Sequence, residues 1–266
     1  MPYLGKRCFA LDLDGTVYLG AVPIKGAVAF IRQHWNEVDF YFLSNNTSKS
    51  TDTYIKKLNG MGIAATAAHM LSPTMPLVEH LRQTGIQRAY LVGNEDYRAT
   101  LLAAMPELLL ADAPDSKPAG NTGDSCVEAV ILAYDTELTY AKLVRAAHLL
   151  QKPDVAYFAT HPDLVCPDPA GPLPDVGSFI ALFEKATGRL PQKIFGKPDP
   201  AVLAPLLARY PRESVVIVGD RLPTDKKLAE NAGIDFVLVL SGEATAQDAA
   251  REKTQPWRIV KNLGLL

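Results

Sequence analysis

The chain has 266 residues, of which 48% are hydrophobic and 21% are charged, and this composition is typical of a folded globular protein. Its formal net charge is −2 and it contains no long basic run, so neither nucleic acid nor an anionic membrane is expected as a partner. Its three cysteines, Cys8, Cys126 and Cys166, are too widely spaced to suggest a disulfide framework or a structural zinc site.

The N-terminal segment lacks the apolar region that is typical of a signal peptide. No apolar run approaches the roughly 20 residues that span a bilayer. Together with the cysteine pattern, these features predict a cytoplasmic protein.

Apolar, strand-like runs alternate with helix-like segments along the chain, which is typical of an α/β protein with a parallel sheet covered on both faces. The predicted strands are residues 8–13, 39–43, 89–92, 127–133, 155–160, 214–218, 236–240 and 257–260. The predicted helices are residues 26–36, 73–81, 97–105, 139–151, 177–187, 200–209 and 224–232. A further helix is expected to begin after a cap at Ser50 or Thr51, to run through Leu58 and to end at Gly60 and Gly62.

Two segments interrupt this alternation. Residues 105–126 are dense in Pro, Gly, Asp and Ser, and we expect a mobile surface loop there. Residues 167–177 contain four prolines, and we expect a rigid, irregular stretch without regular structure of its own.

The stretch Asp12-Leu13-Asp14-Gly15 directly follows the first predicted strand. In an open α/β sheet, binding sites form beyond the carboxyl ends of the strands, so a catalytic corner is one interpretation. A turn that closes the strand is the other, because Asp-Gly is a common turn pair. The stretch by itself leaves both interpretations open.

Three other places raise the same question. Ser44 and Asn45 follow the second predicted strand, Lys197 precedes a proline, and Asp220 and Asp225 follow a later strand. For Ser44 the structural alternative is a turn or cap residue, and for Lys197 it is a solvated surface lysine. For Asp220 it is a turn, and for Asp225 it is a carboxylate in the first turn of a helix. Taken together, the residues supply a set suited to phosphoryl transfer: a carboxylate nucleophile, a carboxyl acid and base, phosphate-binding groups and carboxylate ligands for Mg²⁺.

The chain resembles the haloacid dehalogenase superfamily of phosphohydrolases in four motifs that occur in the order of that superfamily. These motifs are Asp12-Leu13-Asp14-Gly15-Thr16, Ser44 in Leu-Ser-Asn-Asn, Lys197 in Gly-Lys-Pro, and Gly219-Asp220 with Asp225. Within the superfamily, it resembles the NagD-like branch, which includes the 4-nitrophenyl phosphatases. The branch markers are Ser44 to Ser50, Thr160-His161-Pro162-Asp163, Pro174 to Ser178 and Leu238 to Gly242.

The resemblance implies a Rossmann-like core with a doubly wound parallel sheet, formed by residues 1–81 and 185–266. It also implies an inserted α/β cap domain of type IIA at residues 82–184. Mg²⁺ is the implied cofactor. Because caps of this branch often pair, a homodimer is expected.

The resemblance also implies a role for each matching residue of the core. Asp12 would be the nucleophile and a ligand of Mg²⁺, and Asp14 would be the general acid and base, with its backbone carbonyl on the metal. Asp220 would be the second carboxylate ligand, and Asp225 would bind the metal through water. Lys197 would offset the charge between Asp12 and the phosphate.

The implied substrate-binding residues are Ser44, Asn45, Asn46 and Lys197 in the motifs, with His161 and Cys166 as candidates in the cap. His161 stands where relatives often carry Asn, and a structural hydrogen bond is its alternative role. Cys166 falls near the place where pyridoxal phosphate phosphatases carry a histidine.

The sequence therefore predicts a Mg²⁺-dependent phosphomonoester hydrolase that works through an aspartyl-phosphate. The expected substrate is a small phosphorylated metabolite, such as a sugar phosphate, a nucleoside monophosphate or phosphoglycolate, with 4-nitrophenyl phosphate cleaved in vitro. C–halogen hydrolysis is disfavoured, because that reaction has no phosphoryl charge for Mg²⁺ to offset. A non-catalytic sensor of a phosphorylated metabolite is the alternative from another functional class.

Overall fold

The computed structural model describes residues 3–111, 126–168 and 170–266. The chain divides into two compact units, which are described separately. We call Met1–Ser44, Thr51–Leu71 and Lys197–Leu266 the core unit, and Asn45–Ser50 and Ser72–Gly196 the insert unit. Within the described ranges, no helix is both long and apolar enough to cross a membrane.

The core unit is built on a parallel sheet whose strand order is β15-β14-β13-β1-β4-β5. Its strands are β1 (Cys8–Asp12), β4 (Asp39–Leu43), β5 (Met70–Leu71), β13 (Val215–Gly219), β14 (Asp235–Val239) and β15 (Arg258–Val260). Strand β1 lies inside the sheet and pairs with β4 on one side and with β13 on the other, so the later strands are added on opposite sides of it. Ligand sites of open α/β sheets form at such a switch point.

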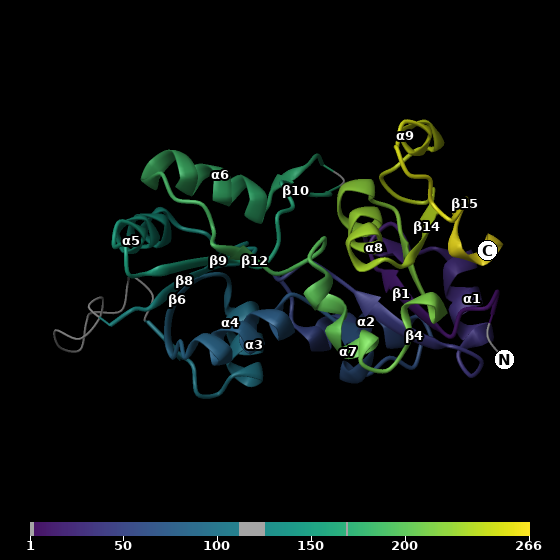
Figure 1. Ribbon diagram of the computed structural model, residues 1–266, viewed down its shortest axis with the longest axis horizontal. Coiled ribbons are helices and arrows are strands. Elements are labelled where there is room, and N and C mark those ends of the chain that lie inside the picture. The colour runs from purple at the N-terminus through teal and green to yellow at the C-terminus, as the bar shows by residue number, and fades with distance from the viewer. Residues whose placement is uncertain (1–2, 112–125, 169) are drawn as a thin grey trace. The chain divides into compact units, whose positions relative to one another are not determined.

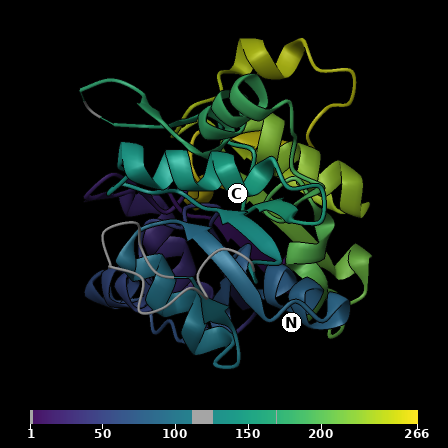
Figure 2. The same ribbon diagram turned by 90° about the vertical axis from the view of Figure 1, so that its left-hand side faces the viewer.

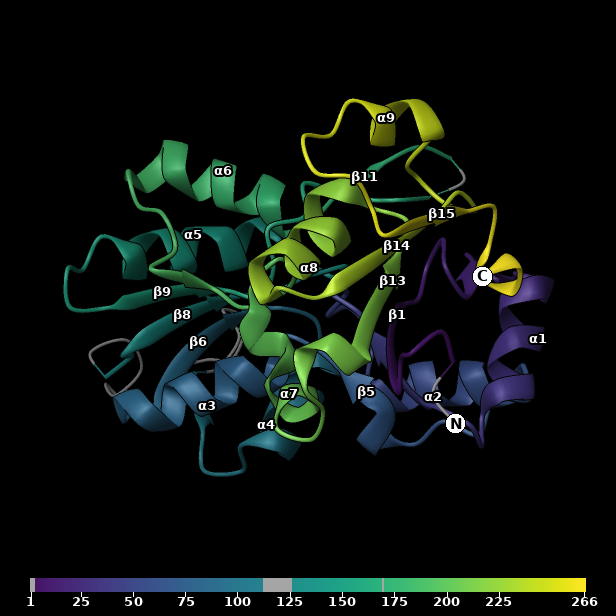
Figure 3. The ribbon, with the colours of Figure 1, turned by 45° about the vertical axis from the view of Figure 1, so that its right-hand side comes forward.

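Helices cover both faces of this sheet (Figure 3). The helices are α1 (Lys25–His34), α2 (Thr51–Gly60), α7 (Ala204–Leu207), α8 (Lys227–Ala232) and α9 (Ala246–Ala250). Side chains of β1 alternate between the two resulting cores: Phe9 and Leu11 pack with α1 and α2, whereas Cys8 and Ala10 pack with α7 and α8. This alternation explains why the strand sequence is apolar throughout.

The core unit also contains short elements that the sequence did not predict. After β1, a hairpin is formed by β2 (Tyr18–Leu19) and β3 (Val22–Pro23). The predicted helix at 200–209 begins instead as a 3₁₀ turn, Pro200–Leu203, and Asp199 caps it by accepting from the backbone N–H of Ala201. The predicted helix at 224–232 is preceded by a π-helical turn, Leu222–Lys226.

The insert unit has its own parallel sheet, with strand order β12-β9-β8-β6-β7. Its strands are β6 (Arg88–Val92), β7 (Leu109–Leu110), β8 (Ala129–Leu132), β9 (Ala156–Ala159) and β12 (Lys193–Ile194). Its helices are α3 (Thr74–Thr84), α4 (Glu95–Ala104), α5 (Tyr140–Leu150) and α6 (Val176–Thr187). Helices α3 and α4 cover one face and α5 and α6 the other (Figures 1 and 2).

The insert unit extends further along the chain than the cap boundaries of 82 and 184 that were expected from sequence. At its start, α3 places Leu77 and Leu81 in the same apolar cluster as strands β6 and β8. At its end, Phe195 is buried in that cluster and lies 5.9 Å from Phe158, measured between ring centroids. These contacts explain why residues 72–81 and 185–196 group with the insert sheet.

Short strands occur in or beside both segments that were expected to lack regular structure. The proline-rich stretch was expected to be irregular, and this was wrong for Leu173–Pro174 (β11), which pairs antiparallel with Val165–Cys166 (β10) just before the stretch. Pro174 is tolerated at the end of such a short edge strand, where a missing N–H matters little. In the segment 105–126, β7 adds a strand to the sheet, and residues 112–125 lie outside the described part of the chain.

Candidate active site

Strand pairing brings three of the expected motifs to one edge of the core sheet. Asp12 is the last residue of β1 and lies opposite Leu43 of β4, so Ser44 follows at the same edge. On the other side, Leu11 lies opposite Val218 of β13, so Gly219 and Asp220 reach this edge as well. Parallel strands thus collect residues that are about 200 positions apart in the sequence.

Lys197 joins this edge through two ion pairs. Its Nζ donates to Asp12 Oδ1 and, over 2.7 Å, to Asp225 Oδ1. All three side chains are buried, and Asp225 is fully enclosed. Such buried, charge-assisted contacts hold the ammonium group in place beside the Asp12 carboxylate.

Asp220 completes a group of three buried carboxylates. One ligand oxygen each from Asp12, Asp220 and Asp225 lies within 4.8 Å of the others. Asp220 Oδ2 accepts a hydrogen bond of 2.7 Å from the backbone N–H of Glu243, while its Oδ1 is buried and has no hydrogen-bond partner among the residues that the structure describes. An orphaned buried oxygen is costly unless a further group satisfies it.

Two glycines leave the space that the Asp220 carboxylate occupies. A Cβ atom at Gly15 or at Gly242 would overlap the Asp220 side chain, and Gly15 also has a φ of +85°. A hydrogen bond connects the segments that contain these two glycines: Ser241 Oγ donates over 2.7 Å to the carbonyl of Gly15. Ser241 and Gly242 belong to the branch marker Leu238 to Gly242, which by itself indicated no place for them at this site.

Burial and mutual repulsion change the acidity of these groups. Burial raises the pKa of Asp12 well above its ordinary range, with Asp225 and Asp220 adding to the rise against the opposing effect of Lys197. Burial, followed by the charge of Asp225, raises the pKa of Asp220 to about 7. Burial acts to lower the pKa of Lys197, but Asp12 and Asp225 outweigh it and raise that pKa. Without a cation, the site therefore favours the neutral forms of Asp12 and Asp220.

Asp14 and Ser44, the other two residues with a predicted catalytic role, differ in their exposure to solvent. Asp14 is exposed, and its Oδ1 accepts a hydrogen bond of 3.4 Å from the backbone N–H of Gly20 in the β2–β3 hairpin. Ser44 is buried, and its backbone N–H donates to the carbonyl of Leu71 over 3.1 Å. Exposure leaves the Asp14 carboxyl able to exchange protons with solvent.

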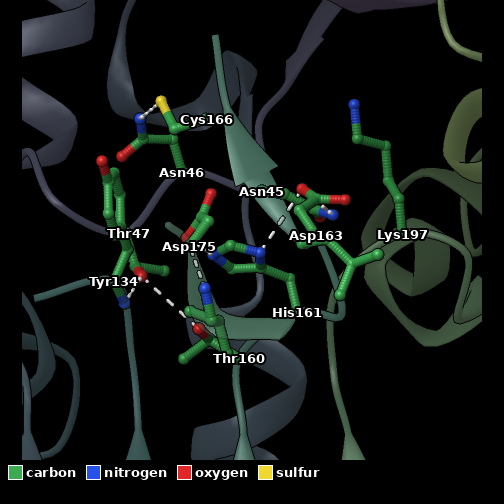
Figure 4. Close-up of polar contacts among 12 residues, drawn as sticks. Asn45, Asn46, Thr47, Tyr134, Thr160, His161, Asp163, Cys166, Asp175 and Lys197 are labelled. Carbon is green, nitrogen blue, oxygen red and sulfur yellow. Dashed lines mark hydrogen bonds and ion pairs between the residues drawn. The ribbon is translucent and has the colours of Figure 1, made fainter. Parts of the chain in front are cut away.

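The remaining expected substrate-binding residues belong to the insert unit. Asn45 Nδ2 donates to Asp163 Oδ2 over 3.1 Å, and Asn46 Nδ2 lies 4.0 Å from the sulfur of Cys166 (Figure 4). His161 is completely buried. Its burial favours the structural role that the sequence left open over direct contact with a substrate.

Comparison with known proteins identifies the family. A family model described as haloacid dehalogenase-like hydrolase matches residues 9–104, and a second, HAD-hydrolase-like, matches residues 194–266. The structure of a 4-nitrophenylphosphatase from Thermotoga maritima is 36% identical, with a TM-score of 0.86, and the match covers 98% of this chain and 96% of that one. The chain belongs to the haloacid dehalogenase-like hydrolases.

Other relatives of this hydrolase cover it to different extents. The acid sugar phosphatase of Staphylococcus haemolyticus is 28% identical over 97% of this chain and 94% of its own length. A glycerol phosphate phosphatase from Mycobacterium tuberculosis, solved with magnesium, is 28% identical, with a TM-score of 0.82 over 96% of this chain and 74% of that one. A NipSnap protein of Caenorhabditis elegans is 31% identical over 82% of this chain, which spans only 45% of that protein.

The cluster formed by Asp12, Asp220 and Asp225 suits a hard divalent cation such as Mg²⁺. Oxygen ligands from a few carboxylates are what Mg²⁺ prefers in proteins. Asp12 and Asp220 would hold the ion, and Asp220 Oδ1 is the buried oxygen to which the described part of the chain offers no hydrogen-bond partner. Asp225 is already paired with Lys197, which agrees with a less direct role for its carboxylate.

We expect the metal-free hydrolase to become more stable as the pH falls from about 8 to about 6. The folded-state pKa of Asp220 is about 7, well above the ordinary value near 4, so the folded protein takes up this proton first and gains stability as the pH decreases. Urea unfolding in EDTA, compared between the wild type and Asp220→Asn, isolates the contribution of this carboxyl. A wild-type advantage that instead grows towards pH 8 would contradict the assignment.

Proposed function

We propose that this hydrolase is a phosphomonoesterase that depends on Mg²⁺ and forms an aspartyl-phosphate on Asp12. One observation carries the proposal: Asp12 is buried at the carboxyl edge of the sheet, held by Lys197 and grouped with Asp220 and Asp225. A buried carboxylate fixed by an ammonium group is oriented for nucleophilic attack. Bound Mg²⁺ would offset the charge that gathers on these carboxylates and on the phosphoryl oxygens.

In the first step, Asp12 attacks the phosphorus atom. Lys197 binds Oδ1, so we assign the attack to Oδ2. The new bond joins Oδ2 to phosphorus, and the bond between phosphorus and the ester oxygen of the substrate breaks. Asp14 gives its proton to that departing oxygen, and its exposed position allows it to be recharged from solvent.

In the second step, Asp14 acts as a base. It removes a proton from a water molecule, whose oxygen then bonds to the phosphorus of the acyl phosphate. The bond between phosphorus and Asp12 breaks, which releases orthophosphate and restores the carboxylate. Lys197 keeps its contact with Asp12 and offsets charge on the phosphoryl group, and Ser44 at the end of β4 supplies a hydroxyl for a phosphoryl oxygen.

The proposed substrate is a small phosphorylated metabolite, and relatives named for sugar phosphates, glycerol phosphate and 4-nitrophenyl phosphate support this class. The roles of Asn45, Asn46, His161 and Cys166 in binding it stay predictions, as do the homodimer and the cytoplasmic location. Phosphate release from a panel of sugar phosphates, nucleoside monophosphates and phosphoglycolate, with Mg²⁺ in excess, tests the proposal. If every phosphoester fails, a phosphometabolite sensor becomes the better explanation, and halide release from haloacids would instead indicate dehalogenation.

We expect Asp220→Asn to weaken the response to Mg²⁺ more than it changes the fold. The amide keeps the shape of the side chain and can still accept from the Glu243 N–H, but it removes one of the negative charges that hold the cation. The Mg²⁺ concentration for half-maximal activity should rise by at least about tenfold. Asp52→Asn, an exposed carboxylate on α2, is the matched control. An unchanged Mg²⁺ titration would remove Asp220 from the metal site.

A further inference from the structure

A second buried polar cluster lies within the insert unit, around His161. The Nδ1 atom of His161 is 3.4 Å from Asp163 Oδ2, and its Nε2 atom is 3.6 Å from Asp175 Oδ1 (Figure 4). The imidazole is completely buried, and neither ring nitrogen has a closer hydrogen-bond partner among the described residues. A buried ring that faces a carboxylate at each nitrogen needs an explanation.

The arrangement favours a ring that links two carboxylates over a metal site. One ligand atom from each of His161, Asp163 and Asp175 lies within 4.8 Å of the others, so a cation is conceivable on distance alone. A metal ion, however, binds one nitrogen of an imidazole, whereas here the two carboxylates face different nitrogens. An ion on either nitrogen would take the place of the hydrogen that this nitrogen can donate, so the arrangement suits contacts between side chains.

Each carboxylate is already committed to a neighbouring segment. Asp175 caps helix α6, since its Oδ1 accepts from the backbone N–H of Val176 over 2.7 Å. Asp163 Oδ2 accepts from Asn45 Nδ2 over 3.1 Å in a buried contact. His161 therefore links the start of α6, through Asp163, to the side chain of Asn45.

A second segment packs against the same cluster at Gly196. A Cβ atom there would lie 2.8 Å from His161 Cβ and 2.8 Å from the carbonyl oxygen of Thr160, and it would overlap Asn45 Oδ1. The chain is thus packed closely where residues 45 and 196 meet within the insert unit. Asn45 is bonded to Ser44 and Gly196 to Lys197, so both residues adjoin members of the proposed catalytic set.

We propose that His161 is a positioning residue, which orients Asp163 so that Asp163 holds Asn45 and, through the chain, the segment that begins at Ser44. The predicted effect of His161 on catalysis rests on the proposed phosphatase function, whereas its predicted effect on the contact between Asp163 and Asn45 does not. A misplacement of about 1 Å at a catalytic group can cost roughly a hundredfold in rate. Loss of the ring nitrogens should therefore affect turnover through Asp163 and Asn45 rather than through contact with the substrate.

The test compares His161→Phe, His161→Gln and a control. Phenylalanine keeps the Cβ that packs on Gly196 but removes both nitrogens, and glutamine restores one donor. We expect His161→Phe to lower kcat by about ten- to a hundredfold with little change in KM, and His161→Gln to recover part of the loss. His148→Phe, at an exposed position of α5, is the matched control and should behave as the wild type.

Coupling identifies the route of the effect. In an Asp163→Asn background, the further loss caused by His161→Phe should shrink to less than about threefold, because the two residues act in one chain of contacts. Losses that multiply independently would overturn the proposal. So would His161-dependent binding of one equivalent of Zn²⁺ to the purified protein, since the cluster would then be a metal site.

Hydrogen exchange provides a readout that needs no activity. His161→Phe should speed amide exchange in peptides that cover residues 45–50 and 160–164, and leave α5 unchanged. Unchanged exchange together with a lower kcat would mean that His161 acts on the substrate directly, which contradicts a positioning role. If the wild type hydrolyses no phosphoester, the proposed function fails while the exchange result still decides the contact between His161, Asp163 and Asn45.

Discussion

Replacement of Asp12 by asparagine should abolish phosphatase activity, with a fall in kcat of about four orders of magnitude or more. The amide oxygen is a poor nucleophile and cannot form the aspartyl-phosphate, although the side chain keeps its size and its place at the end of β1. Steady-state phosphate release at saturating Mg²⁺ measures the loss. Rapid quench with ³²P-labelled substrate should trap a phosphorylated wild type and no phosphorylated variant.

The fold should survive this change, because asparagine can still accept a hydrogen bond from Lys197. Asp52→Asn, in the exposed first turn of α2, controls for the loss of one carboxylate from the core unit and should retain full activity. Asp12→Asn with activity close to that of the wild type would exclude Asp12 as nucleophile. The reaction would then have to proceed by direct attack of water.

Replacement of Lys197 by methionine should cost both activity and stability. Methionine fills a similar volume but leaves the buried carboxylates of Asp12 and Asp225 without their shared ammonium group. Removing one partner from such a buried pair costs about 3–5 kcal/mol, and we expect the lower end, because Asp12 can take up a proton. Activity should fall by about a hundred- to a thousandfold as charge stabilisation at the phosphoryl group is lost.

Urea unfolding in EDTA and in Mg²⁺ separates the two effects of Lys197→Met. The loss in free energy of unfolding should be smaller in Mg²⁺, since a cation among the carboxylates would take over part of the missing charge. Lys227→Met, an exposed lysine of the core unit, is the control and should change neither property appreciably. A Lys197→Met protein as stable as the wild type in EDTA would show that the ion pairs contribute little.

The sequence was sufficient to predict the principal strands of both sheets and the grouping of Asp12, Ser44 and Asp220. The reason is physical: in a parallel sheet, residues that follow buried strands must meet at one edge, so strand ends can be read from apolar runs. Lys197 was included in the phosphoryl-transfer set from the residues, but its role between Asp12 and the phosphate was predicted only through the resemblance. No local pattern indicates that a lysine next to a proline will insert between Asp12 and Asp225.

Other features depend on contacts that the sequence does not display. The β10–β11 pair is only two residues on each side, and its prolines mask any strand pattern. The burial of His161 follows from packing by Gly196 and from two aspartates that come after it in the chain. The insert unit extends beyond residues 82–184 partly because α3 packs on its sheet, and an amphipathic helix gives no sign in the sequence of which sheet it covers.

The division into two units also determines which segments of this protein must be exchanged together in a chimera. The chain passes between its two units after Ser44, Ser50, Leu71 and Gly196, so residues 45–50 belong with the insert although they are distant from it in sequence. Thr47 accepts from the backbone N–H of Tyr134, and the carbonyl of Ser48 accepts from Asn94. A chimera that exchanged residues 72–196 alone would leave these groups facing a foreign surface. A transplant that is meant to carry a new specificity must therefore bring its own version of residues 45–50.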